Sequence, residues 1–165
     1  SYQEAKERLT KYLQQESEPF ILVGLSLGGV LALDLSSQDL PQLKGLVLSG
    51  TQYKLNTNLL YRLQILLFRL IPKRVFEKQG ANKQHMLQIF TELKCLNLTD
   101  IAKTCPLPSL VICGSKDGAN QASSKKLANI LPKGHYLEIA DGGHLLNTQK
   151  PHELAQAIKE FVARF

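Results

Sequence analysis

Residues 20–29 read FILVGLSLGG, an unbroken apolar run that leads into the pattern G-x-S-x-G. The apolar run at 20–23 is typical of a parallel strand that is buried on both faces. Glycines at positions 24 and 28 favour a turn too sharp for larger side chains. The helix-forming segment 30–35 comes next. The stretch therefore predicts a strand, a tight turn that presents Ser26, and a helix.

Ser26 is a candidate nucleophile because such a turn places the serine at the N-terminus of the following helix. The helix dipole and the free backbone N–H groups there favour developing negative charge. The backbone N–H of Leu27, the next residue, is the predicted oxyanion-hole donor. A serine hydroxyl is a poor nucleophile alone, so it needs a base and an acid that orients the base.

Three further apolar runs predict strands at 46–48, 109–113 and, more weakly, 136–139. Segments with helical periodicity lie between and around them, at 1–15, at about 122–131 and from Pro151 onward. Strands that alternate with helices predict an α/β fold. We expect a parallel sheet of about four strands with flanking helices and right-handed crossovers.

Residues 51–104 break this alternation, because they hold helical segments and no convincing strand. We interpret the chain as a single domain, 1–165, with a helical cap inserted at about 51–104. Residues 59–71 are almost entirely apolar, but thirteen helical residues span only about 20 Å, short of a bilayer core of about 30 Å. A lid over an apolar substrate pocket is favoured for this helix, and a membrane-surface role stays open as the alternative.

The acid and the base are expected at the carboxyl ends of later strands, in the chain order serine, acid, histidine. Asp117 follows the strand at 109–113 in the sequence GSKD, and His144 follows the strand at 136–139 in DGGH. Asp141 is the alternative acid, although it lies close to His144 in sequence. The other histidines lie elsewhere: His85, His135 and His152.

Three blocks of sequence, VGLSLGG (23–29), LPSLVICGSKD (107–117) and IADGGHLLNTQKPHELAQAIKEF (139–161), resemble the signature blocks of the α/β-hydrolase superfamily. The resemblance implies a carboxylesterase-like serine hydrolase that cleaves an ester, thioester or similar small acyl substrate through an acyl-serine intermediate. It implies no metal and no organic cofactor. Relatives that open epoxides or remove halides use an aspartate nucleophile, and Ser26 argues against those reactions.

The chain departs from the family pattern ahead of Ser26. Family members carry several strands there, and a loop among them supplies a second oxyanion N–H, whereas this chain begins with one helix. It therefore resembles the C-terminal part of such a hydrolase. Lacking one oxyanion donor costs ~10²–10³ in rate. The strand at 20–23 would also have an open edge, which predicts a homodimer, aggregation, or a requirement for the N-terminal segment supplied in trans. The alternative function is a non-catalytic small-molecule-binding protein or a degenerate fragment that retains the pocket.

Composition limits the other function classes. The chain carries a net charge of +6, but its basic residues are dispersed and form no aromatic-basic RNA motif, so nucleic-acid binding is not expected. The three cysteines have irregular spacing, which fits neither a disulfide framework nor a zinc site. No signal peptide is expected, because the sequence opens with the polar, helical segment SYQEAKERL. We therefore predict a cytoplasmic protein with no stable membrane anchor.

Overall fold

The structure is a computed structural model that describes residues 1–57, 59–77, 80 and 82–165. The described residues form two compact units. One comprises Ser1–Leu9 and Lys54–Asn97, and is called the cap unit below. The other comprises Thr10–Tyr53 and Leu98–Phe165, and is called the sheet unit. Whether the two units make one domain with an inserted cap stays a prediction.

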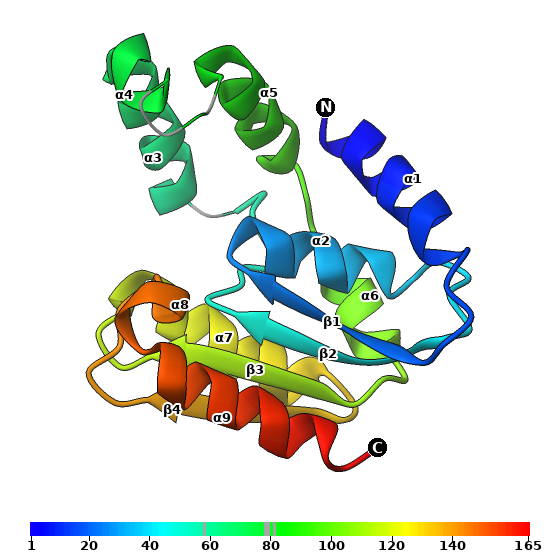
Figure 1. Cartoon of the computed structure of the whole chain (residues 1–165). Coiled ribbons are helices and arrows are strands. Elements are labelled where there is room, and N and C mark those ends of the chain that lie inside the picture. Colours follow the sequence, from blue (N-terminus) through cyan, green and yellow to red (C-terminus); the bar gives the residue numbers. More distant parts are fainter. Residues whose placement is uncertain (58, 78–79, 81) are drawn as a thin grey trace. The chain divides into compact units, whose positions relative to one another are not determined.

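Four parallel strands form the sheet, in the order β1-β2-β3-β4 (Figure 1). Their bounds are β1 (Phe20–Leu25), β2 (Leu43–Ser49), β3 (Ser109–Gly114) and β4 (Gly134–Ile139). The helices of the sheet unit are α2 (Leu27–Leu35), α6 (Thr99–Thr104), α7 (Gly118–Ile130), α8 (Leu146–Gln149) and α9 (Pro151–Val162). Helix α1 (Tyr2–Leu13) is divided between the two units, because the cap unit includes Ser1–Leu9. The predicted fold class, a parallel α/β sheet of four strands with flanking helices, is confirmed.

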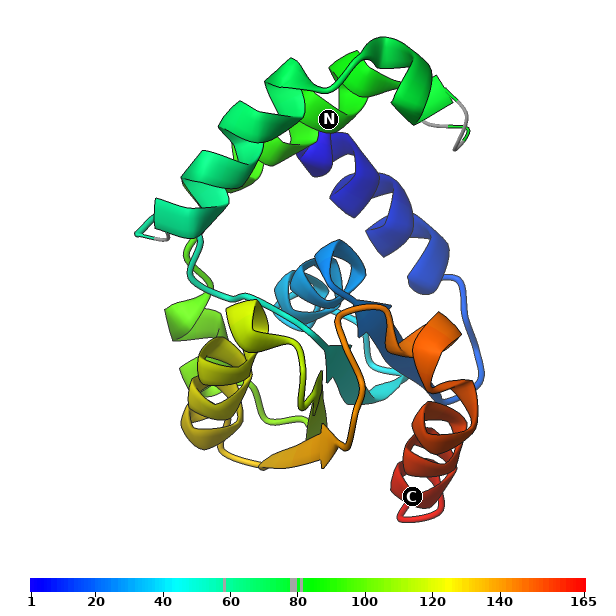
Figure 2. The same cartoon turned by 90° about the vertical axis from the view of Figure 1, so that its left-hand side faces the viewer.

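Helices cover both faces of this sheet. Figure 2 shows α9 against one face, while α7 lies against the other. A buried cluster joins α9 to the central strands: Val47, Leu110, Ile112, Ile139, Leu146, Ala157 and Phe161. The apolar sequences of β2 and β3 follow from this arrangement, because a strand covered on both faces has no side chain in contact with water.

The two outer strands are less buried than the central pair. In β4, GHYLEI, exposed and less exposed residues alternate from Gly134 to Leu137, and Glu138 is exposed as well, which explains its weak apolar signal. In β1, Val23 is 52% exposed, although it lies in the apolar run that predicts a fully buried strand. The prediction of burial on both faces is therefore wrong for β1, which occupies one edge of the sheet.

Three helices make up most of the cap unit: α3 (Leu59–Leu70), α4 (Lys73–Glu77) and α5 (Lys83–Leu93). The Tyr61 hydroxyl donates a hydrogen bond to the Phe90 carbonyl at 3.1 Å, and the two rings meet edge to face. Asn82 caps α5 by accepting from the backbone N–H groups of Gln84 and His85. Within the described part of 51–104, strand pairing is limited to a single bridge between Lys54 and Asn97.

None of the helices in the described ranges is long and apolar enough to cross a membrane. The apolar helix predicted at 59–71 corresponds to α3, which has 12 residues.

Candidate active site

Ser26 is the single residue between the end of β1 and the start of α2, and its backbone is strained. Its φ of 54° lies in the left-handed region, with ψ at −113°. A non-glycine residue there is uncommon and persists only where its surroundings impose it. Two backbone hydrogen bonds hold the turn: Ser26 N donates to Ser49 O at 2.8 Å, and Val30 N donates to Ser26 O at 3.1 Å. The predicted sharp turn is therefore present.

Close packing explains two of the glycines around this turn. A Cβ on Gly24 would overlap the backbone of Gly28, and a Cβ on Gly29 would overlap the Thr51 hydroxyl. A Cβ on Gly28 would meet nothing within 4 Å. The expectation that a side chain at 28 would clash is therefore wrong. The positions that leave no room for a side chain are Gly24 and Gly29.

Leu27, the predicted oxyanion donor, is the first residue of α2. Backbone N–H groups in the first turn of a helix have no acceptor within the helix. The position is therefore compatible with donation to a developing oxyanion.

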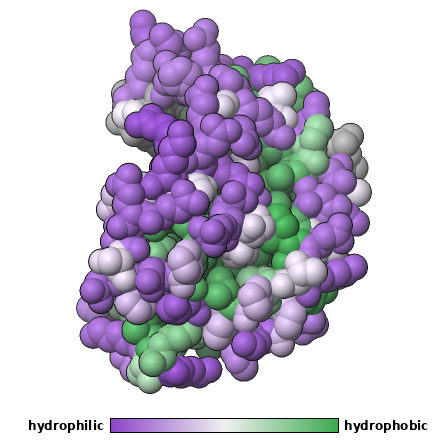
Figure 3. Space-filling model, turned by 90° about the vertical axis from the view of Figure 1, so that its right-hand side faces the viewer, coloured by the Kyte–Doolittle hydropathy of each residue, from purple (hydrophilic) through white to green (hydrophobic). Residues whose placement is uncertain are grey.

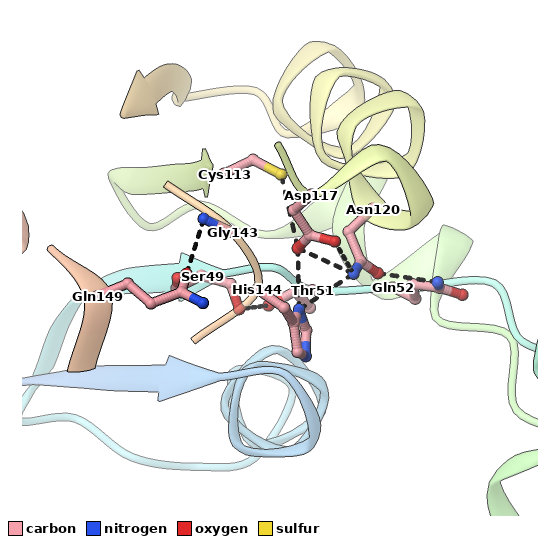
Figure 4. A network of polar contacts seen from close by, with 9 residues as sticks. All are labelled: Ser49, Thr51, Gln52, Cys113, Asp117, Asn120, Gly143, His144 and Gln149. Atoms are coloured by element: carbon pink, nitrogen blue, oxygen red, sulfur yellow. Dashed lines mark hydrogen bonds and ion pairs between the residues drawn. The ribbon is translucent and has the colours of Figure 1, made fainter. Parts of the chain in front are cut away.

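Asp117 and His144 come from neighbouring strand ends and meet directly. Asp117 lies three residues beyond the end of β3, and only 6% of the residue is exposed. His144 follows β4 and is half-buried. His144 Nδ1 lies 2.8 Å from Asp117 Oδ2 (Figure 4). A proton on Nδ1 then makes this hydrogen bond and leaves Nε2 free to accept another proton.

Gly50 connects this pair to the nucleophile turn. It follows Ser49, whose carbonyl binds Ser26 N, and it has a φ of +55°. A Cβ at Gly50 would lie 3.0 Å from His144 Nδ1 and 3.3 Å from Asp117 Oδ2. The three predicted catalytic residues thus lie at the same edge of one unit. Among the described residues the Ser26 hydroxyl makes no hydrogen bond to His144.

Asp141, the alternative acid, is engaged elsewhere. Its carboxylate forms an exposed ion pair with Lys116, with Oδ1 2.9 Å from Nζ. The hydrogen bond and the charge of Lys116 lower the pKa of Asp141. The structure thus brings Asp117 to His144 and leaves Asp141 on the surface.

Two residues that the sequence does not single out complete the polar network in Figure 4. Asn120 Nδ2 donates to both carboxylate oxygens of Asp117, at 2.8 Å to Oδ1 and 3.0 Å to Oδ2. Gln52 Nε2 donates to Asn120 Oδ1 at 2.9 Å. The only sequence signal is that Asn120 follows Asp117 by three residues at the start of a helix.

The buried Cys113 thiol contacts the Asp117 carboxylate, with Sγ 4.0 Å from Oδ2. Burial raises the pKa of this thiol to about 11. The thiol therefore remains protonated at neutral pH and places no second negative charge beside Asp117.

A family model described as serine aminopeptidase, S33, matches residues 3–96, more than half of the chain. The chain therefore belongs to this family of α/β hydrolases. A search of curated proteins found no match.

Solved structures with the same fold are α/β hydrolases of low sequence identity. A hydrolase from Pseudomonas aeruginosa PA01 has a TM-score of 0.82 at 17% identity, over 98% of this chain and 72% of its own. MenH from S. aureus has a TM-score of 0.81 at 17% identity, over 99% and 76%. The enol-lactonase from Burkholderia xenovorans LB400 has a TM-score of 0.80 at 16% identity, over 99% and 73%. At these identities the likeness establishes the fold alone.

Proposed function

We propose that this protein is a serine hydrolase that cleaves an ester, thioester or similar small acyl substrate, with Ser26, His144 and Asp117 as nucleophile, base and acid. One observation carries the proposal: a strained Ser26 lies at the same sheet edge as the 2.8 Å contact between His144 and Asp117. Membership of a hydrolase family and hydrolase neighbours with the same fold support it.

In the acylation step, His144 Nε2 takes the proton of the Ser26 hydroxyl while Oγ attacks the acyl carbonyl carbon. The resulting oxyanion accepts a hydrogen bond from the Leu27 N–H. The tetrahedral intermediate then collapses, the alcohol or thiol leaves with the proton from His144, and the acyl group stays on Ser26.

In the deacylation step, water gives its proton to His144 and attacks the acyl carbon. Collapse releases the carboxylic acid, and the proton returns to Ser26 Oγ. Asp117 stays ionised throughout, because its role is to orient the imidazole and to stabilise the imidazolium that forms.

The experiment that tests the assignment compares two aspartate variants on a 4-nitrophenyl ester. Asp117→Asn should lower kcat by about 10⁴, as expected when the base is held in the wrong tautomer. Asp141→Asn is the matched control and should change kcat less than about twofold, since its exposed ion pair is weak. If Asp141→Asn lowers kcat more than Asp117→Asn does, the acid assignment is wrong. If the parent protein shows no turnover of any acyl ester, the non-catalytic binding function is favoured.

A further inference from the structure

Asn120 is held against the acid of the proposed triad on the first turn of α7. Its side chain is almost fully buried, with 7% of the residue exposed. Nδ2 lies 2.8 Å from Asp117 Oδ1 and 3.0 Å from Asp117 Oδ2. A buried carboxylate needs such donors, because charge removed from water is costly without hydrogen bonds.

Gln52 determines which way the Asn120 amide faces. Gln52 lies beyond the end of β2, and its Nε2 donates to Asn120 Oδ1 at 2.9 Å. With the amide oxygen engaged there, the NH₂ group points at Asp117 (Figure 4). A reversed amide would set its oxygen against the carboxylate, acceptor against acceptor.

The Asn120 amide and the His144 ring both approach the same oxygen. Nδ2 of Asn120 is 3.1 Å from Nδ1 of His144, and both nitrogens contact Asp117 Oδ2. When Nδ1 carries a proton it cannot accept from Asn120, so both donors are satisfied only by the carboxylate. The arrangement therefore favours the tautomer of His144 that carries its proton on Nδ1 and leaves Nε2 free.

We propose that Asn120, oriented by Gln52, is a positioning residue that fixes the Asp117 carboxylate toward His144. This inference rests on the proposed function, since it assigns a role within that site. Without the amide, Asp117 Oδ1 loses its donor, and the carboxylate is free to rotate away from the imidazole. Asn120 touches neither the nucleophile nor the reacting bond, and it acts only through Asp117.

The direct test is Asn120→Leu, which keeps a similar shape but removes the donors. The matched control is Asn129→Leu, which changes an exposed asparagine of the same helix. Loss of a hydrogen bond to a charged group should lower kcat/KM about tenfold to a hundredfold. In Asn129→Leu the ratio should stay within about twofold of the parent value.

A titration of the His144 ring, followed by NMR, separates positioning from simple loss of folded protein. Among the described residues, Asp117 is the titratable group that contacts His144, and Cys113 contacts Asp117 in turn. The Cys113 thiol, whose pKa burial raises to about 11, is neutral in the range used. In Asn120→Leu the carboxylate is free to rotate away from the imidazole, so the protonated ring loses part of its charge interaction and the titration midpoint should move to lower pH. A destabilised but correctly arranged site would show an unchanged midpoint, and that result would overturn the proposal.

A second variant keeps the test decisive if Asn120→Leu does not fold. Gln52→Leu leaves Asn120 in place but frees its amide to reverse, so the midpoint should move in the same direction by a smaller amount. The double variant should match Asn120→Leu alone, because Gln52 acts through Asn120. Fully additive shifts, or no shift in Gln52→Leu, would contradict the orienting role of Gln52.

The titration needs no turnover, so failure of the positioning role of Asn120 is distinguishable from failure of the proposed hydrolase activity. A shifted midpoint in a protein whose Ser26 proves inert would support the role of Asn120 and reject the hydrolase activity. An active enzyme whose His144 midpoint is unchanged in Asn120→Leu would support the hydrolase activity and reject the role of Asn120.

Discussion

At the scale of single residues, Gly50 is the position where one added methyl group should lower both the stability and the activity. Its φ of +55° disfavours any side chain, and a Cβ would meet the imidazole of His144. Gly50→Ala should cost about 1–2 kcal/mol of unfolding free energy from the backbone strain. Displacement of the base by even about 1 Å should lower kcat by a further ~10².

Gly118→Ala is the matched control for this prediction, because a Cβ at Gly118 meets nothing within 4 Å although it adjoins Asp117. Thermal unfolding and ester hydrolysis are measured on both variants. An unchanged kcat in Gly50→Ala would contradict the placement of His144 against this turn.

The sequence identifies Ser26, Asp117 and His144 as candidates because each follows a recognisable strand. Asn120 and Gln52 have no such signal. They lie 68 positions apart, and only the folded sheet brings their side chains to 2.9 Å. Polar residues of this kind resemble ordinary surface residues until burial is known. The clash expected at Gly28 is absent for the same reason, since the surroundings of this residue depend on the path of the neighbouring backbone.

At the scale of elements, α9 should contribute much of the stability of the sheet unit. Phe161 is 2% exposed in the cluster that covers β2 and β3, and it meets Phe165 edge to face. Phe161→Ala should lower the free energy of unfolding by about 3–5 kcal/mol. The neighbouring Val162 is 44% exposed, so Val162→Ala should cost less than about 1 kcal/mol. Equal losses in urea unfolding would show that α9 does not pack as described.

The sequence predicts elements well where apolar runs or helical periods are long. The strands expected at 46–48 and 109–113 appear as Leu43–Ser49 and Ser109–Gly114. The predicted boundaries are wrong where an element has polar ends. Helix α7 starts at Gly118, four residues before the predicted 122, because its first turn has no apolar signal. The four residues of α8 are too few to show a helical period.

At the scale of the whole molecule, the outer edge of β1 is the feature that bears on assembly. Among the described residues, no strand pairs with the outer side of β1, and Val23 within this strand is exposed. Figure 3 shows one face of the protein on which apolar residues lie between hydrophilic ones. An apolar, uncharged edge is a template for pairing with another chain. We therefore propose that this chain forms a homodimer through β1, about a two-fold axis.

Sedimentation equilibrium across a range of concentrations tests this proposal. The parent chain should show a concentration-dependent mass, whereas Val23→Lys should remain monomeric, because a charge on an edge strand opposes pairing. Val162→Lys places the same charge on α9, away from the edge, and should associate like the parent. A monomeric parent at high concentration would contradict the assignment.

The most direct measurement of the central claim is the reaction of the protein with a fluorophosphonate, followed by mass spectrometry. An activated serine at the strained turn should take up one phosphonyl group on Ser26, and the rate should fall sharply in His144→Ala, which removes the base. Ser26→Ala should abolish labelling. Labelling on another serine, or none on the folded protein, would contradict the account.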